Sequence, residues 1–232
     1  MGFRRMTVSY FLRAVVGIIC KIDCREAVEK LAKNKPMLVV FNHVNFLEVP
    51  AIVAYCYPTY ITGLAKVETW KNPFFAFLFN TYKAIPIDRV GAFSEPFRRV
   101  RETIENGYHM IIAPEGTRSR DGVLGQGKAG VVQLALEADL QILPVAHHGG
   151  ENIWKNLKRF KRTPFCFKAG SPFKIKLNGK PGQRPNKSER EQIISEIMGQ
   201  MAKLLPVDKR GMYTEQAEQE CKYLDFINDT HL

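Results

Sequence analysis

Residues 36–41 read Pro-Met-Leu-Val-Val-Phe, a short apolar run without a polar side chain. A run of this length predicts a β-strand that is buried on both of its faces. Further apolar runs recur along the chain, and we expect a strand at each of them: 60–64, 82–87, 110–113, 142–146 and 173–177. Helical patterns lie between the runs, at roughly 49–57, 72–80, 94–106 and 128–138.

The alternation of strands and helices predicts an α/β fold. We expect a central sheet, mixed but largely parallel, that is covered by helices on both faces. Near the C-terminus, Ser188 and Glu191 form a capping box, which predicts a further helix running to about Leu205. In such folds reactive groups lie on loops at the ends of the strands.

The N-terminal residues predict an amphipathic helix. Residues 6–22 are apolar but include Arg13 and Lys21, so the segment is too short and too charged to span a bilayer, which takes about 20 apolar residues. One helix face would carry Val8, Phe11, Leu12, Val15, Ile18, Ile19 and Ile22, and the other Arg5, Ser9, Arg13 and Lys21. This pattern is typical of a helix in the membrane interface with its cations towards the head groups. The alternative is an ordinary helix packed on the domain.

The net charge of +11 is concentrated in one segment. Residues 152–188 contain eleven lysines and arginines and no aspartate or glutamate. Such a segment indicates a polyanionic partner, either an anionic membrane, a phosphorylated cofactor or nucleic acid, with a solvated surface as the plain alternative. We do not expect nucleic acid, because no recognised binding motif accompanies the charge.

The cysteines and histidines do not indicate a metal site. The five cysteines lie at 20, 24, 56, 166 and 221, without the close spacing of a zinc knuckle, and we expect reduced thiols. His147 and His148 are adjacent, but on a strand their side chains would point to opposite faces, which makes a poor chelate.

A histidine and a carboxylate follow the first predicted strand. His43 comes two residues after Phe41, and Glu48 lies five residues further on. On one continuous helix the two would be about 140° apart, so they can meet only if His43 is in a turn and Glu48 opens the next helix. A pair of this kind serves as a general base with its orienting carboxylate. The alternative is a solvated loop histidine.

The predicted strand at 110–113 leads into a loop that suits a phosphate group. Residues 114–119 read Pro-Glu-Gly-Thr-Arg-Ser, so a glycine-containing loop offers backbone N–H groups, hydroxyls and the guanidinium of Arg118. These donors match a phosphate monoester. An ordinary turn is the alternative.

Together these segments resemble the glycerophosphate and lysophosphatidate acyltransferase family. That family carries an Asn-His-x-x-x-x-Asp block and a Phe-Pro-Glu-Gly-Thr-Arg-Ser block, which are matched here by Asn42-His43 to Glu48 and by 113–119. Residues 84–89, 126–130, 142–145 and 205–213 are similar to further blocks. Glu48 departs from the family's usual aspartate, and Asn45 stands where serine is common. The resemblance covers roughly 25–213, so we expect an interface helix at 1–24, an acyltransferase domain at 25–213 and a tail at 214–232.

The resemblance also implies a reaction. An acyl chain would move from an acyl-coenzyme A or acyl-carrier-protein thioester to the free hydroxyl of 1-acyl-glycerol-3-phosphate (lysophosphatidate), in phospholipid biosynthesis. His43 would deprotonate the hydroxyl and Glu48 would orient His43. No cofactor or metal ion is implied beyond this co-substrate. The alternatives are another lysolipid or glycerol 3-phosphate as acceptor, or a non-catalytic membrane-docking protein of the same fold.

Roles for further residues follow from the same resemblance. It implies that the acceptor phosphate is bound by Glu115, Gly116, Thr117 and Arg118, with support from Arg89. It also implies that Pro144, Val145 and Lys128 lie in the acyl-donor region. The expected location is the cytoplasmic face of a membrane, as a peripheral or monotopic protein with an anionic membrane surface as partner.

Overall fold

A computed structural model describes residues 2–87, 94–177 and 184–227, with the side chains of 94–97 excepted. Its strands are β1 Cys20–Asp23, β2 Leu38–Phe41, β3 Ile61–Lys66, β4 Ile85–Ile87, β5 His109–Ile112, β6 Ile142–His148, β7 Thr163–Ala169, β8 Phe173–Ile175 and β9 Leu224–Phe226. Its α-helices are α1 Gly2–Ile19, α2 Arg25–Lys33, α3 Glu48–Tyr55, α4 Pro73–Tyr82, α5 Ser94–Glu105, α6 Gly130–Glu137, α7 Ile153–Leu157 and α8 Lys187–Lys203.

The strands form one mixed sheet in the order β1-β7-β6-β2-β5-β3-β4, with β8 and β9 attached beside β6. The pairs of β2 with β5 and β6, and of β3 with β4 and β5, are parallel, whereas β7 runs antiparallel to β6. The predicted α/β fold with a largely parallel sheet is therefore confirmed.

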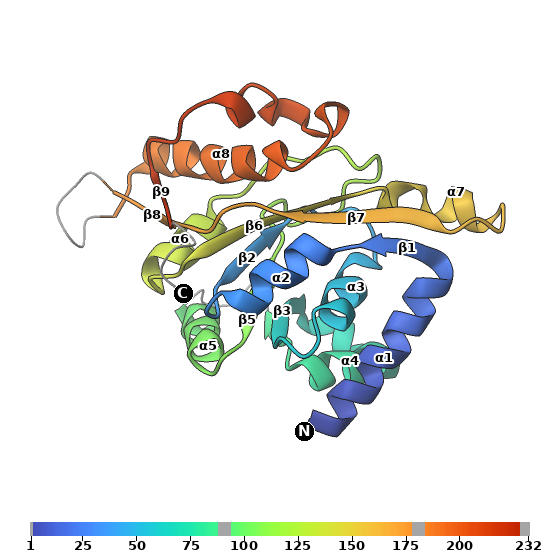
Figure 1. The fold of residues 1–232 in the computed structure, drawn as a ribbon. Coiled ribbons are helices and arrows are strands. Elements are labelled where there is room, and N and C mark those ends of the chain that lie inside the picture. Colours follow the sequence, from blue (N-terminus) through green and yellow to red (C-terminus); the bar gives the residue numbers. More distant parts are fainter. Residues whose placement is uncertain (1, 88–93, 178–183, 228–232) are drawn as a thin grey trace.

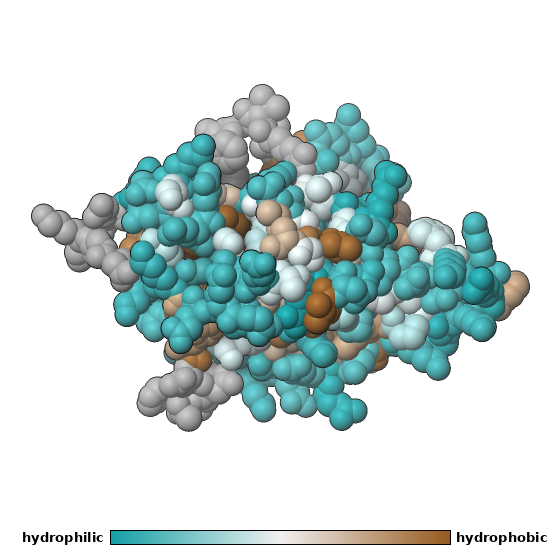
Figure 2. Space-filling view, turned by 90° about the horizontal axis from the view of Figure 1, so that it is seen from above, coloured by the Kyte–Doolittle hydropathy of each residue, from teal (hydrophilic) through white to brown (hydrophobic). Residues whose placement is uncertain are grey.

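The middle strand β2 explains why the sheet needs a layer on each face. Its residues are all buried, but they alternate between two cores. Leu38 and Val40 pack with side chains of α6 and α8, whereas Val39 and Phe41 pack with those of α1, α2 and α3. Figure 1 shows α8 on one side of the sheet and α1, α3 and α4 on the other. Seen from the α8 side, the surface is largely hydrophilic, with a small group of hydrophobic residues near its centre (Figure 2).

Some predicted elements need correction. All of the predicted strands and helices occur, but the strands β1, β7 and β9 and the helices α2 and α7 were not expected. In β7 the burial alternates along the strand, so the apolar residues of one face are separated by exposed ones and do not form a continuous run. The last long helix begins earlier than predicted. Its capping box is made by Asn186 and Glu189, not by Ser188 and Glu191, and each side chain accepts a hydrogen bond from the other's backbone N–H.

The predicted two faces of the N-terminal helix are also wrong. Helix α1 buries Val8, Leu12 and Val16 against the domain, but Phe11 and Ile18 from the same predicted face are 61% and 75% exposed. The predicted polar face turns inwards. Arg13 donates to the carbonyls of Ala54, Tyr55 and Tyr57, beside the C-terminal end of α3, where a cation is favourable.

The predicted domain boundaries do not separate folding units. After α1 the chain continues into β1, which pairs with β7 in the main sheet. The described part of the predicted tail, residues 214–227, likewise packs onto the domain, because β9 pairs with β8 and Tyr223 and Leu224 belong to the core under α8. Within the described ranges, no helix has both the length and the apolar character needed to cross a membrane.

Candidate active site

His43 and Glu48 meet at the carboxyl end of β2. The strand ends at Phe41, a loop carries His43, and α3 begins at Glu48, which is the arrangement that their spacing required. Nδ1 of His43 contacts Oε1 of Glu48. The other carboxylate oxygen, Oε2, accepts the backbone N–H groups of Val44 at 3.1 Å and Asn45 at 2.8 Å. Because Glu48 has no exposed surface, its carboxylate is a fixed acceptor behind a partly exposed imidazole.

A second histidine lies on the same carboxylate. Nε2 of His147 is 3.3 Å from Oε2 of Glu48 and 2.6 Å from the carbonyl oxygen of Asn42. The side chain of Asn42 in turn donates to the carbonyl of His147 and accepts from its N–H, both at 2.8 Å. We did not predict this contact. The adjacent placement of β2 and β6 in the sheet, which the sequence pattern leaves open, brings His147 beside the loop that follows β2.

The two imidazoles keep Glu48 ionised. Burial raises the pKa of Glu48, but hydrogen bonds and charge from His147 and His43 outweigh that effect and lower the pKa to about 2. With its Nδ1 proton donated to this carboxylate, His43 presents the lone pair of Nε2, and 24% of its side chain is exposed. The arrangement therefore suits a general base that takes a proton from a bound hydroxyl.

Glu115 connects the histidine loop to the loop after β5. Its Oε1 accepts the N–H of His43 and its Oε2 accepts the N–H of Gly125, both at 2.9 Å. The carbonyl of His43 also accepts the N–H of Ser119 at 2.7 Å. Burial raises the pKa of Glu115, and the two N–H donors partly offset that rise. Glu115 is 2% exposed with both oxygens in use, so it braces the site and does not offer a surface to a ligand.

The remaining residues of that loop face outwards. Gly116, Thr117 and Arg118 are exposed, and the backbone at Gly116 has a φ of +66°, in the left-handed region that favours glycine. Lys128 lies against Gly116, because a Cβ at that glycine would be 3.0 Å from Nζ of Lys128. The structure thus places Lys128 beside the predicted phosphate loop, and its place in the acyl-donor region stays a prediction.

The predicted donor residues Pro144 and Val145 are interior residues of the sheet. They pair with Val40 and Phe41 of β2, both are buried, and Val145 has no exposed surface. Their place in the acyl-donor region stays a prediction, and because both side chains are buried they would shape such a region from within the sheet and not from its surface. Arg89 lies outside the described residues. Within the described chain, no group of histidine, cysteine and acidic side chains is arranged to hold a metal ion.

Comparison with known proteins identifies similar sequences and similar solved structures. The family model described as Acyltransferase matches residues 23–148. A 1-acyl-sn-glycerol-3-phosphate acyltransferase of Limnanthes douglasii is 32% identical over 158 residues, covering 66% of this chain and 54% of that protein. A 1-acyl-sn-glycerol-3-phosphate acyltransferase of Cocos nucifera is 30% identical over 145 residues, covering 61% of this chain and 47% of that protein. The crystal structure of the 1-acyl-sn-glycerophosphate acyltransferase of Thermotoga maritima superposes with a TM-score of 0.60 at 21% identity, covering 83% of this chain and 76% of that one. The chain spans about half the length of the curated relatives it matches.

Proposed function

The chain belongs to the Acyltransferase family, and from this premise we propose that it acylates the free hydroxyl of lysophosphatidate. The similar proteins named above carry that activity in their names. The observation that supports the proposal is that two hydrogen bonds join the loop of His43 to the loop after β5. Glu115 and Ser119 tie the backbone of His43 to the loop that presents Thr117 and Arg118. A phosphate held at that loop would bring a nearby hydroxyl to the imidazole.

The proposed reaction uses one base and no covalent enzyme intermediate. Nε2 of His43 removes the proton from the acceptor hydroxyl while the oxygen attacks the thioester carbonyl of the donor. When the tetrahedral intermediate collapses, the carbon–sulfur bond breaks and the imidazolium returns the proton to the leaving thiolate. Glu48 stabilises the imidazolium and fixes the orientation of the ring. The donor is acyl-coenzyme A or acyl-carrier protein.

The proposed phosphate site consists of exposed donors on a braced loop. Arg118 and Thr117 contact the acceptor phosphate, with backbone N–H groups of the loop and the ammonium of Lys128 beside Gly116. Glu115 holds the loop from behind. This differs from the sequence-based prediction, in which Glu115 bound the phosphate and Lys128 lay in the acyl-donor region.

The acceptor test is an assay of the full chain with one radiolabelled long-chain acyl-coenzyme A and a panel of acceptors. The panel contains lysophosphatidate, glycerol 3-phosphate, a zwitterionic lysophospholipid and a lysolipid without phosphate. The proposal predicts the highest kcat/KM for lysophosphatidate and little turnover without a phosphate. Equal rates for all lysolipids would reject the phosphate-directed acceptor site, and no turnover with any acceptor would favour the non-catalytic alternative.

We propose that the protein binds anionic membranes peripherally through α7 and the adjoining end of α1. Trp154, Leu157 and Phe160 are 60%, 43% and 99% exposed, and they alternate with Lys155, Lys158, Arg159 and Lys161. Residues 158–162 follow α7. Arg162 in this segment donates to the carbonyl of Cys20 at 2.8 Å, so the segment lies next to the end of α1, where Ile18 is exposed. Apolar side chains among cations suit an interface of anionic lipid.

The membrane test uses point variants, because deleting residues 1–22 would also remove buried residues of α1 and most of β1. The double variant Trp154→Ser with Phe160→Ser should float less well with anionic vesicles than the wild type. The control variant Val207→Ser with Met212→Ser also removes exposed apolar side chains, but from the segment after α8. Equal losses in both variants would argue against a specific role for α7.

A further inference from the structure

A small pocket opens at the edge of the sheet opposite His43. It lies where β3 and β5 begin, since Tyr60 and Tyr108 directly precede these strands. His43 follows the carboxyl end of β2, which is parallel to β5. The described residues lining the pocket are Gly2, Arg4, Arg5, Tyr60, Asn80, Thr81, Lys83 and Tyr108. The two sites are therefore separated by the length of the central strands.

Arg5 is an unusual residue to find in this position. It is 4% exposed, and its Nη2 donates a hydrogen bond to the carbonyl of Ile61 at 2.9 Å. Its Nε has no hydrogen-bond partner among the described residues. The rings of Tyr60, Tyr82 and Tyr108 surround its Cζ, with centroids at 4.7, 5.0 and 5.5 Å. The cation–π contacts with the three tyrosine rings stabilise part of the guanidinium charge. The buried Nε–H of Arg5 nevertheless has no acceptor among the residues that the structure describes, and leaving a buried polar group unpaired is unfavourable.

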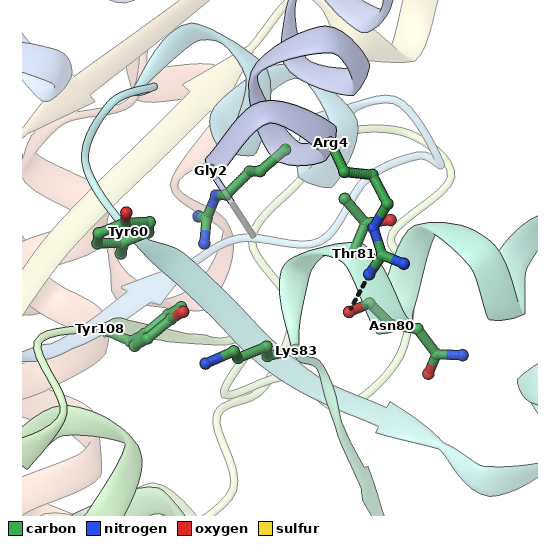
Figure 3. A pocket seen from close by; sticks show the side chains of 8 residues that line it. Gly2, Arg4, Tyr60, Asn80, Thr81, Lys83 and Tyr108 are labelled. Atoms are coloured by element: carbon green, nitrogen blue, oxygen red, sulfur yellow. Dashed lines mark hydrogen bonds between the residues drawn. The ribbon is translucent and has the colours of Figure 1, made fainter.

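Further positive charge converges on the same pocket. Nζ of Lys83 lies 5.0 Å from the centroid of Tyr108, so two cations share one ring. Arg4 lies at the other side and donates to the carbonyl of Asn80 (Figure 3). The N-terminal end of α1 also lines the pocket, and the first turn of this helix contains no acidic residue. No carboxylate is among the lining residues in the described part of the chain.

The size of the pocket limits what it can hold. Its volume of about 50 Å³ is far below the roughly 300–1,000 Å³ of pockets that enclose drug-sized ligands. An acyl chain or a whole nucleotide is therefore excluded, whereas a small anionic group fits. Guanidinium, ammonium and helix N-terminal N–H groups together match the oxygens of a phosphate.

We propose that this pocket is a second anion site, which binds a phosphate group through Arg5, Lys83 and the N-terminal turn of α1. The phosphate belongs either to a small soluble compound or to the head group of a phospholipid. The site lies at the opposite end of the central strands from His43, so it takes no part in the proton transfer.

The test uses the full chain and leaves the buried Arg5 in place, because its replacement would disturb the fold. The pocket variant is Arg4→Gln with Lys83→Asn; both residues are exposed, and asparagine tolerates the left-handed backbone at Lys83, where φ is 55°. The matched control, Lys203→Gln with Lys222→Gln, removes two exposed charges from α8 and from the loop that precedes β9. A third variant, Arg118→Ala, removes the proposed acceptor contact.

Two probes distinguish the sources of the phosphate. The first is inorganic phosphate, with thermal stabilisation measured against chloride at equal ionic strength. The second is the difference in binding between phosphatidylcholine vesicles and the same vesicles with phosphatidic acid. We expect that the control variant and Arg118→Ala keep at least one of the two responses, stabilisation by inorganic phosphate or binding to phosphatidic acid vesicles. The pocket variant should show that response weakened by about tenfold or more. A response to vesicles alone assigns the site to a lipid head group, and a response to inorganic phosphate assigns it to a soluble compound. Equal responses in the pocket and control variants, or no response to either probe, would overturn the proposal.

Discussion

Oε2 of Glu48 lies 3.3 Å from Nε2 of His147, an imidazole without exposed surface. The same carboxylate contacts Nδ1 of His43 through its other oxygen. Glutamate is one methylene longer than the aspartate of the motif that this loop resembles, and here it reaches from the start of α3 to both imidazoles. The substitution is therefore compatible with an oriented base at His43.

Replacing Glu48 by aspartate and by glutamine should have unequal effects on turnover. Aspartate keeps a charge that a small shift of the loop can bring to His43, so we expect Glu48→Asp to lower kcat by less than about tenfold. Glutamine removes the charge that stabilises the imidazolium, so Glu48→Gln should lower kcat by roughly 10²-fold or more. Steady-state kinetics of the two variants provides the comparison. A loss in Glu48→Asp as large as that in Glu48→Gln would show that position, not charge, is what Glu48 supplies.

The ionisation of Glu48 should contribute to stability in a defined range of pH. The ordinary pKa is 4.5, and the folded protein lowers it to about 2. A carboxyl with a lowered pKa stabilises the fold above its ordinary value, and this contribution is lost as the pH falls towards the folded value. The free energy of unfolding of Glu48→Gln should therefore fall less steeply than that of the wild type between these two values. Parallel curves from denaturant titrations would mean that the carboxylate is not held as described.

Glu115 should affect stability and turnover together. In Glu115→Gln one oxygen still accepts a backbone N–H, but the amide nitrogen then meets the other N–H, donor against donor. We expect a loss of about 1–3 kcal/mol in the free energy of unfolding. Because the backbone of His43 is then less firmly held, kcat should also fall, with a smaller effect on the KM for lysophosphatidate. A selective rise of that KM at unchanged stability would instead indicate direct contact between Glu115 and the acceptor.

Arg118 should act on acceptor binding. A charge-assisted contact to phosphate contributes about 1.5–3 kcal/mol, so Arg118→Ala should raise the acceptor KM by roughly tenfold or more, with little change in the donor KM. Arg120→Ala is the matched control, since it removes an exposed guanidinium two residues further on. If both variants raise the KM equally, the effect comes from general surface charge.

The sequence predicted those parts of the molecule that depend on local pattern. Residues 38–41 are apolar without interruption, which is sufficient to predict a strand buried on both faces. The spacing of His43 and Glu48 likewise predicted that the two meet only if His43 lies in a turn and Glu48 begins the next helix. In the structure α3 begins at Glu48.

Features that depend on strand order were not predictable in the same way. His147 reaches Glu48 only because β6 lies beside β2, although about a hundred residues separate the two strands in the chain. The inward orientation of Arg5 and Arg13 depends on partners that tertiary packing supplies, the carbonyl of Ile61 and those at the end of α3. Helical periodicity places these arginines on one face but does not say which face is covered.

The kcat of His43→Ala, measured with lysophosphatidate and a long-chain acyl-coenzyme A, tests the central claim most directly. His43 lies on a loop and is partly exposed, so the variant should keep the wild-type circular dichroism spectrum. General-base catalysis contributes about 10²–10⁴ in rate, and we predict a loss of kcat in that range. Adding Glu48→Gln should lower kcat little further, because the carboxylate acts through the ring. A folded His43→Ala protein that turns over at the wild-type rate would contradict the account.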